Sequence, residues 1–229
     1  MEFLKHFPVL TEPQVKTLFQ HSREISYALR QDSSILFPEP LAQDGQTIRY
    51  QFIELPPPLI EQMQAQNSLE DDMRHIGCAL ALIHKGATTH DRTLLHGDFV
   101  PHNVFLQSGK IIIIDPHLPE NLPFSEALLY GDRRRDVTAF IFGIFSDVGL
   151  KRALKHYRYY NHLARWFLSG YASACPVRPF LLPVLTYGKD VYVMKCKAHF
   201  SCMNSLAHCV GAGLATLCVI WSYQCRRKS

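Results

Sequence analysis

Several features that identify common protein classes are missing from this sequence. Its seven cysteines contain no Cys-x-x-Cys pair, and an odd number of cysteines without regular spacing does not form a disulfide framework. We therefore expect a reducing compartment and a cytoplasmic location. The chain reaches Pro8 without the apolar run of a secretory signal peptide. It also contains no Gly-x-Gly-x-x-Gly segment, so no glycine-rich loop for a phosphate group can be assigned.

Acidic residues are almost absent from the last third of the chain. Residues 151–229 contain 12 Lys and Arg but a single acid, Asp190, whereas residues 1–150 contain 12 Lys and Arg and 19 Asp and Glu. This asymmetry favours an anionic partner for the basic region, such as an acidic membrane surface or a phosphorylated glycan. No specific nucleic-acid-binding motif accompanies the basic residues. The other interpretation is a scattered, solvated surface.

Long apolar runs are also scarce, with one exception near the C-terminus. Residues 206–222 are mostly uncharged, but this stretch is short for a membrane-spanning helix, which needs about 20 residues. An apolar helix rich in small residues also suits the core of a globular protein. We therefore expect a core helix or a peripheral membrane contact in preference to a membrane span, although a membrane-associated protein stays open.

What the sequence does contain is the composition of a folded protein with strands and helices. Hydrophobic residues make up 47% of the 229 residues and charged residues 19%, which is typical of a globular chain. Residues 3–7 predict a short strand, Thr11 predicts a helix start, and Asp44-Gly45 predicts a hairpin turn. A later helix has apolar side chains along one face, at Leu69, Met73, Ile76, Leu80 and Ile83.

The most informative stretch covers residues 95–116. Asp98 and Asn103 lie five positions apart in a segment that glycine and proline keep from forming a regular helix. A Ser-Gly turn follows, and then the run of isoleucines at 111–114 predicts a buried strand that ends at Asp115. A carboxylate at the end of such a strand points out of the core. We therefore expect the turn to bring Asp115 back beside Asp98 and Asn103.

This spacing resembles the catalytic and metal loops of kinases. The chain has His96-Gly97-Asp98 before Asn103, and Asp115-Pro116 after the strand. These residues resemble the aminoglycoside and choline kinase family and, more distantly, the lipopolysaccharide core kinases. The resemblance implies a protein-kinase-like bilobal α+β fold, with a reduced N-terminal β lobe and a mainly helical C-terminal lobe. It also implies ATP and Mg²⁺ as cofactors.

The resemblance assigns a task to each polar residue of the stretch. Asp98 would orient the acceptor hydroxyl and accept its proton, and His96 would hold the catalytic loop in place. Asn103 and Asp115 would bind Mg²⁺, which prefers hard oxygen ligands. Each residue alone is typical of a solvated turn, but the combination with the His-Gly pair and the isoleucine run favours a site.

Outside this stretch, the resemblance places further residues at the nucleotide. Lys5 and Glu24 would form the ion pair that grips the phosphates, an assignment that rests on order and spacing. Glu54 and Leu55 would lie at the hinge between the lobes, where backbone groups meet the adenine. Asp136 is expected to cap a core helix and to fix the catalytic loop.

These assignments divide the chain into three parts. Residues 1–55 would form the reduced N-lobe of strand, helix and hairpin, residues 56–172 the kinase-like C-lobe, and residues 173–229 a basic, apolar helical extension. The leading function is transfer of the γ-phosphoryl group of ATP to a hydroxyl of a small molecule or glycan. Because a glycine-rich loop is missing, the alternative is a non-catalytic pseudokinase or regulatory binding module. A third interpretation is a basic membrane-associated scaffold.

Overall fold

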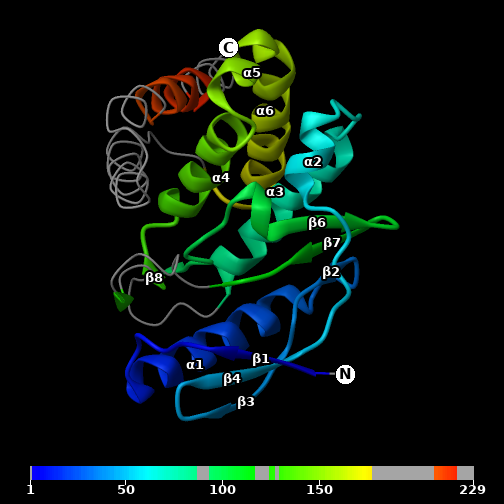
Figure 1. The fold of residues 1–229 in the computed structure, drawn as a ribbon. Helices are drawn as coiled ribbons and strands as arrows, with labels where there is room; N and C mark the ends of the chain where they lie inside the picture. The colour runs from blue at the N-terminus through cyan, green and yellow to red at the C-terminus, as the bar shows by residue number, and fades with distance from the viewer. Residues whose placement is uncertain (1, 87–92, 117–123, 127–128, 177–208, 221–229) are drawn as a thin grey trace.

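The protein is an α+β structure in which small sheets and one helix lie beside a larger helical part (Figure 1). The computed structural model describes residues 2–86, 93–116, 124–126, 129–176 and 209–220. The N-terminal strands and the first helix lie at the bottom of Figure 1, and most of the other helices lie at the top. The predicted fold class is confirmed.

The N-terminal part is a three-stranded antiparallel sheet with a helix packed against it. Strand β1 (Glu2–His6) pairs with β4 (Thr47–Gln51), which also pairs with β3 (Pro40–Asp44). Helix α1 (Glu12–Leu29) begins where the N–H of Thr11 donates to Gln14 Oε1 at 2.9 Å. The small core of this part contains Phe7, Val15, Leu18, Ile48, Tyr50 and Leu129.

The remaining strands form two further small sheets. The first contains β2 (Ile35–Leu36), β7 (Lys110–Ile113) and β6 (Val104–Gln107), and the second contains β5 (Thr93–Leu94) and β8 (Tyr130–Gly131). A short 3₁₀ helix, η1 (Pro101–Asn103), leads into β6. The predicted Ser108-Gly109 turn joins β6 to β7, and both of its residues have positive φ, +51° and +77°. The turn therefore returns the chain toward Asn103, as the sequence indicates.

Helices form the larger part of the structure. They are α2 (Leu59–Gln64), α3 (Glu70–Lys85), α4 (Arg134–Ser146), α5 (Leu150–Lys155), α6 (Tyr157–Ala174) and a helix at residues 209–220. The apolar face predicted for α3 is completely buried in the main core. Helices α3 and α6 approach closely at Gly77 and Gly170. A Cβ atom at Gly170 would lie 1.8 Å from the carbonyl oxygen of Arg74, so only glycine fits there.

The helix at residues 209–220 is the described part of the apolar C-terminal stretch. Its buried side chains join the main core at Cys209, Ala212, Ala215, Val219 and Ile220. No helix in the described ranges of the chain has the length and apolar character needed to cross a membrane. The described part therefore fits the core-helix interpretation, and residues 206–208 and 221–222 lie outside the described residues.

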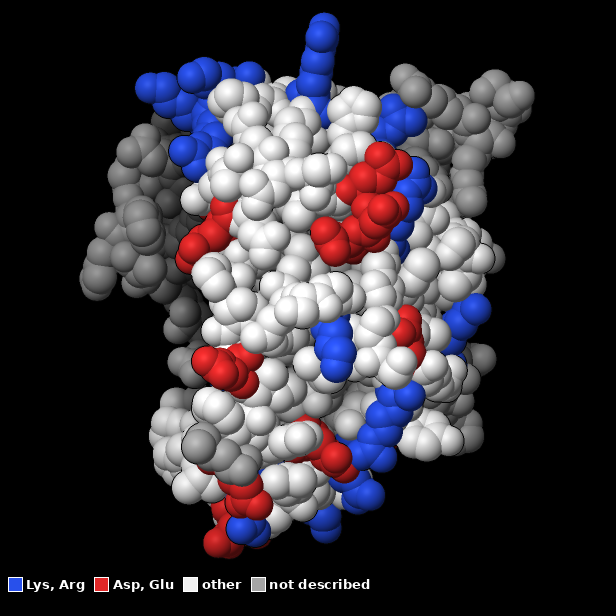
Figure 2. Space-filling model, turned by 90° about the vertical axis from the view of Figure 1, so that its right-hand side faces the viewer, with Lys and Arg blue, Asp and Glu red and all other residues white. Residues whose placement is uncertain are grey.

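Lys and Arg side chains lie at the top and along the lower part of the face shown in Figure 2. The top is the end where α5 lies in Figure 1. Lys151, Arg152, Lys155 and Arg158 are exposed there, on α5 and the first turn of α6. Most other basic residues of the predicted basic region lie outside the described residues. Contact with an anionic membrane surface stays a prediction.

Candidate active site

The candidate catalytic residues are connected by hydrogen bonds. Asn103 Nδ2 donates to the carbonyl oxygen of Asp98 at 2.9 Å and to Asp98 Oδ2 at 3.0 Å. The N–H of Asn103 donates to the carbonyl oxygen of Val100 at 3.0 Å, within the turn of η1. Because an amide carries its nitrogen and oxygen on opposite sides of one carbon, Asn103 Oδ1 is directed away from Asp98.

A buried carboxylate fixes the start of the candidate catalytic loop, residues 96–103. Asp136 has no exposed surface and accepts hydrogen bonds from the N–H groups of His96, at 2.6 Å, and Gly97, at 3.1 Å. His84 Nε2 lies 3.1 Å from the same carboxylate, and His84 Nδ1 lies 2.8 Å from the Tyr171 hydroxyl. Burial alone would raise the pKa of Asp136, but His84 and the His96 N–H hold this pKa below its usual value. Asp136 is the third residue of α4, so it fixes the loop from inside the helix and not from the expected N-cap position.

The environment of Asp98 disfavours its charged form. Burial raises the pKa of Asp98 to about 7, the hydrogen bond from Asn103 opposes this change, and the carboxylates of Asp115, Asp136 and Asp147 add to it. A carboxyl group with a pKa near neutral is suited to exchange a proton with a substrate at physiological pH.

Asp115 follows β7 and faces Lys5 on β1. Lys5 Nζ lies 2.8 Å from Asp115 Oδ1. The N–H of Ile114 donates to the carbonyl oxygen of Asn103 at 3.1 Å, so Asp115 comes directly after a residue paired with Asn103. The φ angle of Asp115 is +54°, a conformation that is costly for a residue with a side chain and that recurs at functional sites.

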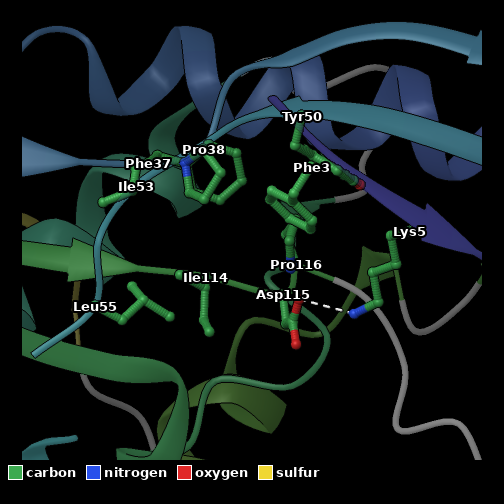
Figure 3. A pocket seen from close by; sticks show the side chains of 10 residues that line it. All are labelled: Phe3, Lys5, Phe37, Pro38, Tyr50, Ile53, Leu55, Ile114, Asp115 and Pro116. Atoms are coloured by element: carbon green, nitrogen blue, oxygen red, sulfur yellow. Dashed lines mark hydrogen bonds and ion pairs between the residues drawn. The ribbon is translucent and has the colours of Figure 1, made fainter. Parts of the chain in front are cut away.

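A cavity of about 280 Å³ opens at this ion pair (Figure 3). Figure 3 shows Lys5 and Asp115 at one end of the cavity, and Ile53 and Leu55, from the segment after β4, at the other. The remaining lining residues are Phe3, Phe37, Pro38, Tyr50, Ile114 and Pro116. One charged end and one apolar end suit a ligand that combines a ring with phosphate groups.

Known proteins resemble this chain in structure. No protein-family model and no curated protein matches its sequence. A glucosamine kinase (crystal form B) matches with a TM-score of 0.62 at 11% identity, and the match covers 96% of this chain and 73% of that chain. A glucosamine kinase in complex with glucosamine, ADP and inorganic phosphate matches with a TM-score of 0.58 at 10% identity, over 91% of this chain and 72% of that chain.

A second enzyme also matches this chain in structure. The gentamicin complex of APH(2″)-IIa matches with a TM-score of 0.51 at 13% identity, over 94% of this chain and 86% of that chain. This chain has the kinase-like fold. The chain shares this fold with the glucosamine kinase and with APH(2″)-IIa.

Within this kinase-like fold, the two predicted phosphate-binding residues have different partners from those expected. Lys5 is paired with Asp115, and Glu24 Oε2 accepts a hydrogen bond from the Tyr130 hydroxyl at 3.1 Å. The expected ion pair between Lys5 and Glu24, both within the described residues, is therefore not formed. Lys5 lines the cavity, whereas Glu24 connects α1 to β8. Phosphate binding by these two residues stays a prediction.

Leu55, Glu54 and His96, the other predicted residues, differ in whether they line the cavity. Leu55 lines its apolar end, while Glu54 is exposed and is not a lining residue. His96 is fully buried, and its ring packs edge-on against Phe99 with 5.2 Å between ring centres. Since its backbone also binds Asp136, this position suits a residue that holds the loop.

The sequence analysis missed a contact between α1 and the catalytic loop. His21 Nε2 lies 2.6 Å from the carbonyl oxygen of Leu95, and its ring packs edge-on against Tyr130 with 5.6 Å between ring centres. The available signal was a histidine three positions after Leu18, on the apolar face of α1. A polar side chain on a buried face needs a partner, which here lies one residue before His96.

The oxygen donors at the charged end fit Mg²⁺. The Asp115 carboxylate and Asn103 Oδ1 are hard ligands, and Mg²⁺ is commonly bound by one or two carboxylates together with phosphate oxygens and water. Among the residues that the structure describes, no group of three or more His, Cys, Asp and Glu could hold a metal. A carboxylate and an amide oxygen suit a cation that also binds phosphate oxygens.

Proposed function

We propose that this protein is a phosphotransferase that uses ATP and Mg²⁺ to phosphorylate a hydroxyl of a small molecule or glycan. The observation that carries the proposal is the ion pair of Lys5 and Asp115 at the charged end of the cavity. The residue before Asp115, Ile114, is paired through its backbone with Asn103, whose side chain is hydrogen-bonded to Asp98. The fold supports it, because its structural relatives include a kinase with bound glucosamine and ADP and a phosphotransferase with bound gentamicin.

The nucleotide side of the proposed site uses five residues. Ile53 and Leu55 would receive the base at the apolar end of the cavity. Lys5 would exchange its contact with Asp115 for phosphate oxygens, which frees the carboxylate. Asp115 and Asn103 would hold Mg²⁺, and this ion, when bound, neutralises charge on the phosphate groups.

The acceptor side depends on Asp98. Its carboxylate would orient the acceptor hydroxyl and accept its proton, and a pKa of about 7 leaves a large ionised fraction at neutral pH. Asn103 fixes the carboxylate by donating to Oδ2. Buried His96 and Asp136 hold the start of the loop in place through their hydrogen bond. The chain thus contributes mainly positioning and charge neutralisation, which is what phosphoryl transfer requires.

Thermal shift with ADP or ATP tests the nucleotide part of the proposal. With Mg²⁺ and nucleotide at about 100 times the dissociation constant, the free energy of unfolding should rise by about 3 kcal/mol. For a chain of this length that corresponds to a rise in Tm of roughly 5–10 °C. Asp115→Ala removes a proposed Mg²⁺ ligand, so its Mg²⁺-dependent shift should disappear.

Asp44→Ala is a suitable control, because Asp44 is exposed at the end of β3. This variant should keep the full shift. If millimolar nucleotide with Mg²⁺ leaves the Tm of the wild type unchanged, the phosphotransferase proposal fails. The alternative, a non-catalytic pseudokinase or regulatory binding module, would then explain the fold. The Lys5–Asp115 ion pair is compatible with that alternative as well, because it occupies a proposed metal ligand.

A further inference from the structure

An ion pair beside the catalytic loop has no task in the mechanism above. His102 lies in η1, directly before Asn103, and its Nδ1 lies 3.1 Å from Oδ2 of Asp147 at the C-terminal end of α4. The side chain of His102 is 55% exposed and that of Asp147 is 23% exposed. Exposed ion pairs contribute little to stability. A role in folding therefore does not account for this pair.

Asp147 is held firmly in place. Its N–H donates to the carbonyl oxygen of Gly143 at 2.9 Å, and its Oδ1 accepts a hydrogen bond from the Ser146 hydroxyl at 2.6 Å. Pro101 packs against the same turn of α4, since a Cβ atom at Gly143 would lie 2.5 Å from Pro101 Cδ. Asp147 therefore fixes the His102 ring through Nδ1, and the outer nitrogen, Nε2, is the atom that a ligand can contact.

The pair also lies beside Asp98 in the loop, because the side chain of Asn103, the residue after His102, donates to Asp98 Oδ2 at 3.0 Å. Burial is the main reason for the raised pKa of Asp98, and the charge of Asp147 adds to it. The hydrogen bond to Asp147 is the main reason for the raised pKa of His102, and the charge of Asp98 adds to it. Neither His102 nor Asp147 lines the cavity assigned to the nucleotide. An acceptor that approaches Asp98 from outside that cavity has His102 nearby.

We propose that His102, positioned by Asp147, binds a second polar group of the acceptor and selects polyhydroxylated acceptors over simple alcohols. This inference rests on the proposed phosphotransferase function. With Nδ1–H facing the carboxylate, Nε2 accepts a hydrogen bond from a hydroxyl or amino group when the ring is neutral. When the ring is protonated, Nε2–H donates one to a hydroxyl oxygen. Sugars and amino sugars carry such a group beside the hydroxyl that is phosphorylated. Choline, with one hydroxyl, does not.

Steady-state kinetics with glucosamine, glucose, myo-inositol and choline test this role. The wild type should use at least one of the three polyhydroxylated probes better than choline. His102→Ala should raise the KM for that probe about tenfold, which is the loss of one good hydrogen bond. Its kcat should change little, because Asp98 and Asn103 remain. The KM for choline should be the same in His102→Ala as in the wild type.

Two further variants separate positioning from folding. Asp147→Ala should raise the same KM, whereas Asp147→Asn should restore it, because an amide oxygen also accepts the hydrogen bond from Nδ1–H. His162→Ala is the matched control, since His162 is exposed on α6 and lies against Trp166. An equal loss with choline and with the polyhydroxylated probes, or no change in any KM, overturns the inference.

Binding of the probes can be measured without catalysis. In an NMR titration of the full chain, the ring resonances of His102 should shift with at least one polyhydroxylated probe and not with choline. If no probe shifts them at saturating concentration, the inference is wrong, whatever the kinetics. If a sugar shifts them but nucleotide gives no thermal shift, the acceptor site stands and the phosphotransferase proposal fails.

Discussion

Asp98→Asn is expected to lower the rate of phosphoryl transfer by roughly 10²–10⁴-fold, which is typical for the loss of a positioned acid or base. The asparagine can still accept the hydrogen bond that Asn103 donates to Oδ2, so the loop should keep its shape. It cannot accept a proton from the acceptor. The assay is ADP formation with saturating acceptor, and the thermal shift with nucleotide and Mg²⁺ should persist in the variant.

The same substitution has a pH-dependent effect on stability in the metal-free protein. Burial raises the pKa of Asp98 from 3.8 to about 7. A raised pKa in the folded state means that the carboxyl stabilises the fold only while it is protonated. The free energy of unfolding of the wild type should therefore fall as the pH rises from about 4 to 7. Asp98→Asn has no carboxyl at this position, so its free energy of unfolding should not show this fall. The variant should gain about 2–4 kcal/mol at pH 8 and clearly less at pH 5.

Urea unfolding at the two pH values measures this difference. Asp44→Asn is the control, because its carboxyl is exposed and should give no pH-dependent gain. A gain for Asp98→Asn that is equal at pH 5 and pH 8 would contradict the raised pKa. Activity should follow the same titration in the opposite sense: the wild-type rate should rise with pH through about 7, as the proposed base ionises.

Residues close together in the sequence could be placed from the sequence alone. The turn at Ser108 and Gly109, with the isoleucine run behind it, correctly predicted the β6–β7 hairpin and the return of Asp115 toward Asn103. The apolar face of α3 was equally clear. These features depend on turn chemistry and periodicity, which act over a few residues.

Contacts between distant segments could not be predicted in the same way. Lys5 binds Asp115, 110 positions away, and the order of residues alone could not distinguish this partner from Glu24. Strand β2 has only two residues, too few for a periodic pattern, and its pairing with β7 fixes it.

Polar partners from distant segments were the other gap. His84, in the last turn of α3, lies in the core and contacts Asp136, a partner that no neighbouring residue in the sequence indicates. The pair of His102 and Asp147 gave no sequence signal, because it joins a 3₁₀ turn to the end of a helix 45 positions later. In both pairs, the packing of α4 against the catalytic loop decides which residues meet.

Asp136→Ala is expected to destabilise the protein by about 3–5 kcal/mol, the loss found when one partner of a buried ion pair is removed. Its carboxylate accepts hydrogen bonds from the N–H groups of His96 and Gly97 and contacts His84 Nε2. In the variant all three groups stay buried without their acceptor, and alanine offers no substitute. Urea unfolding at pH 7 measures the loss, and the backbone just before Asp98 should lose hydrogen-exchange protection.

Two variants show whether the loss comes from this network or from the start of α4. Asp132→Ala removes an exposed carboxylate that accepts from the N–H of Arg134 at 3.0 Å, and it should cost only about 1 kcal/mol. Asp136→Asn keeps one oxygen acceptor and should fall between the two alanine variants, which gives a measurable result even if Asp136→Ala does not fold. Equal losses for Asp136→Asn and Asp132→Ala would mean that Asp136 acts only as a helix-start residue. The catalytic loop would then have to be held by the His21 contact with Leu95.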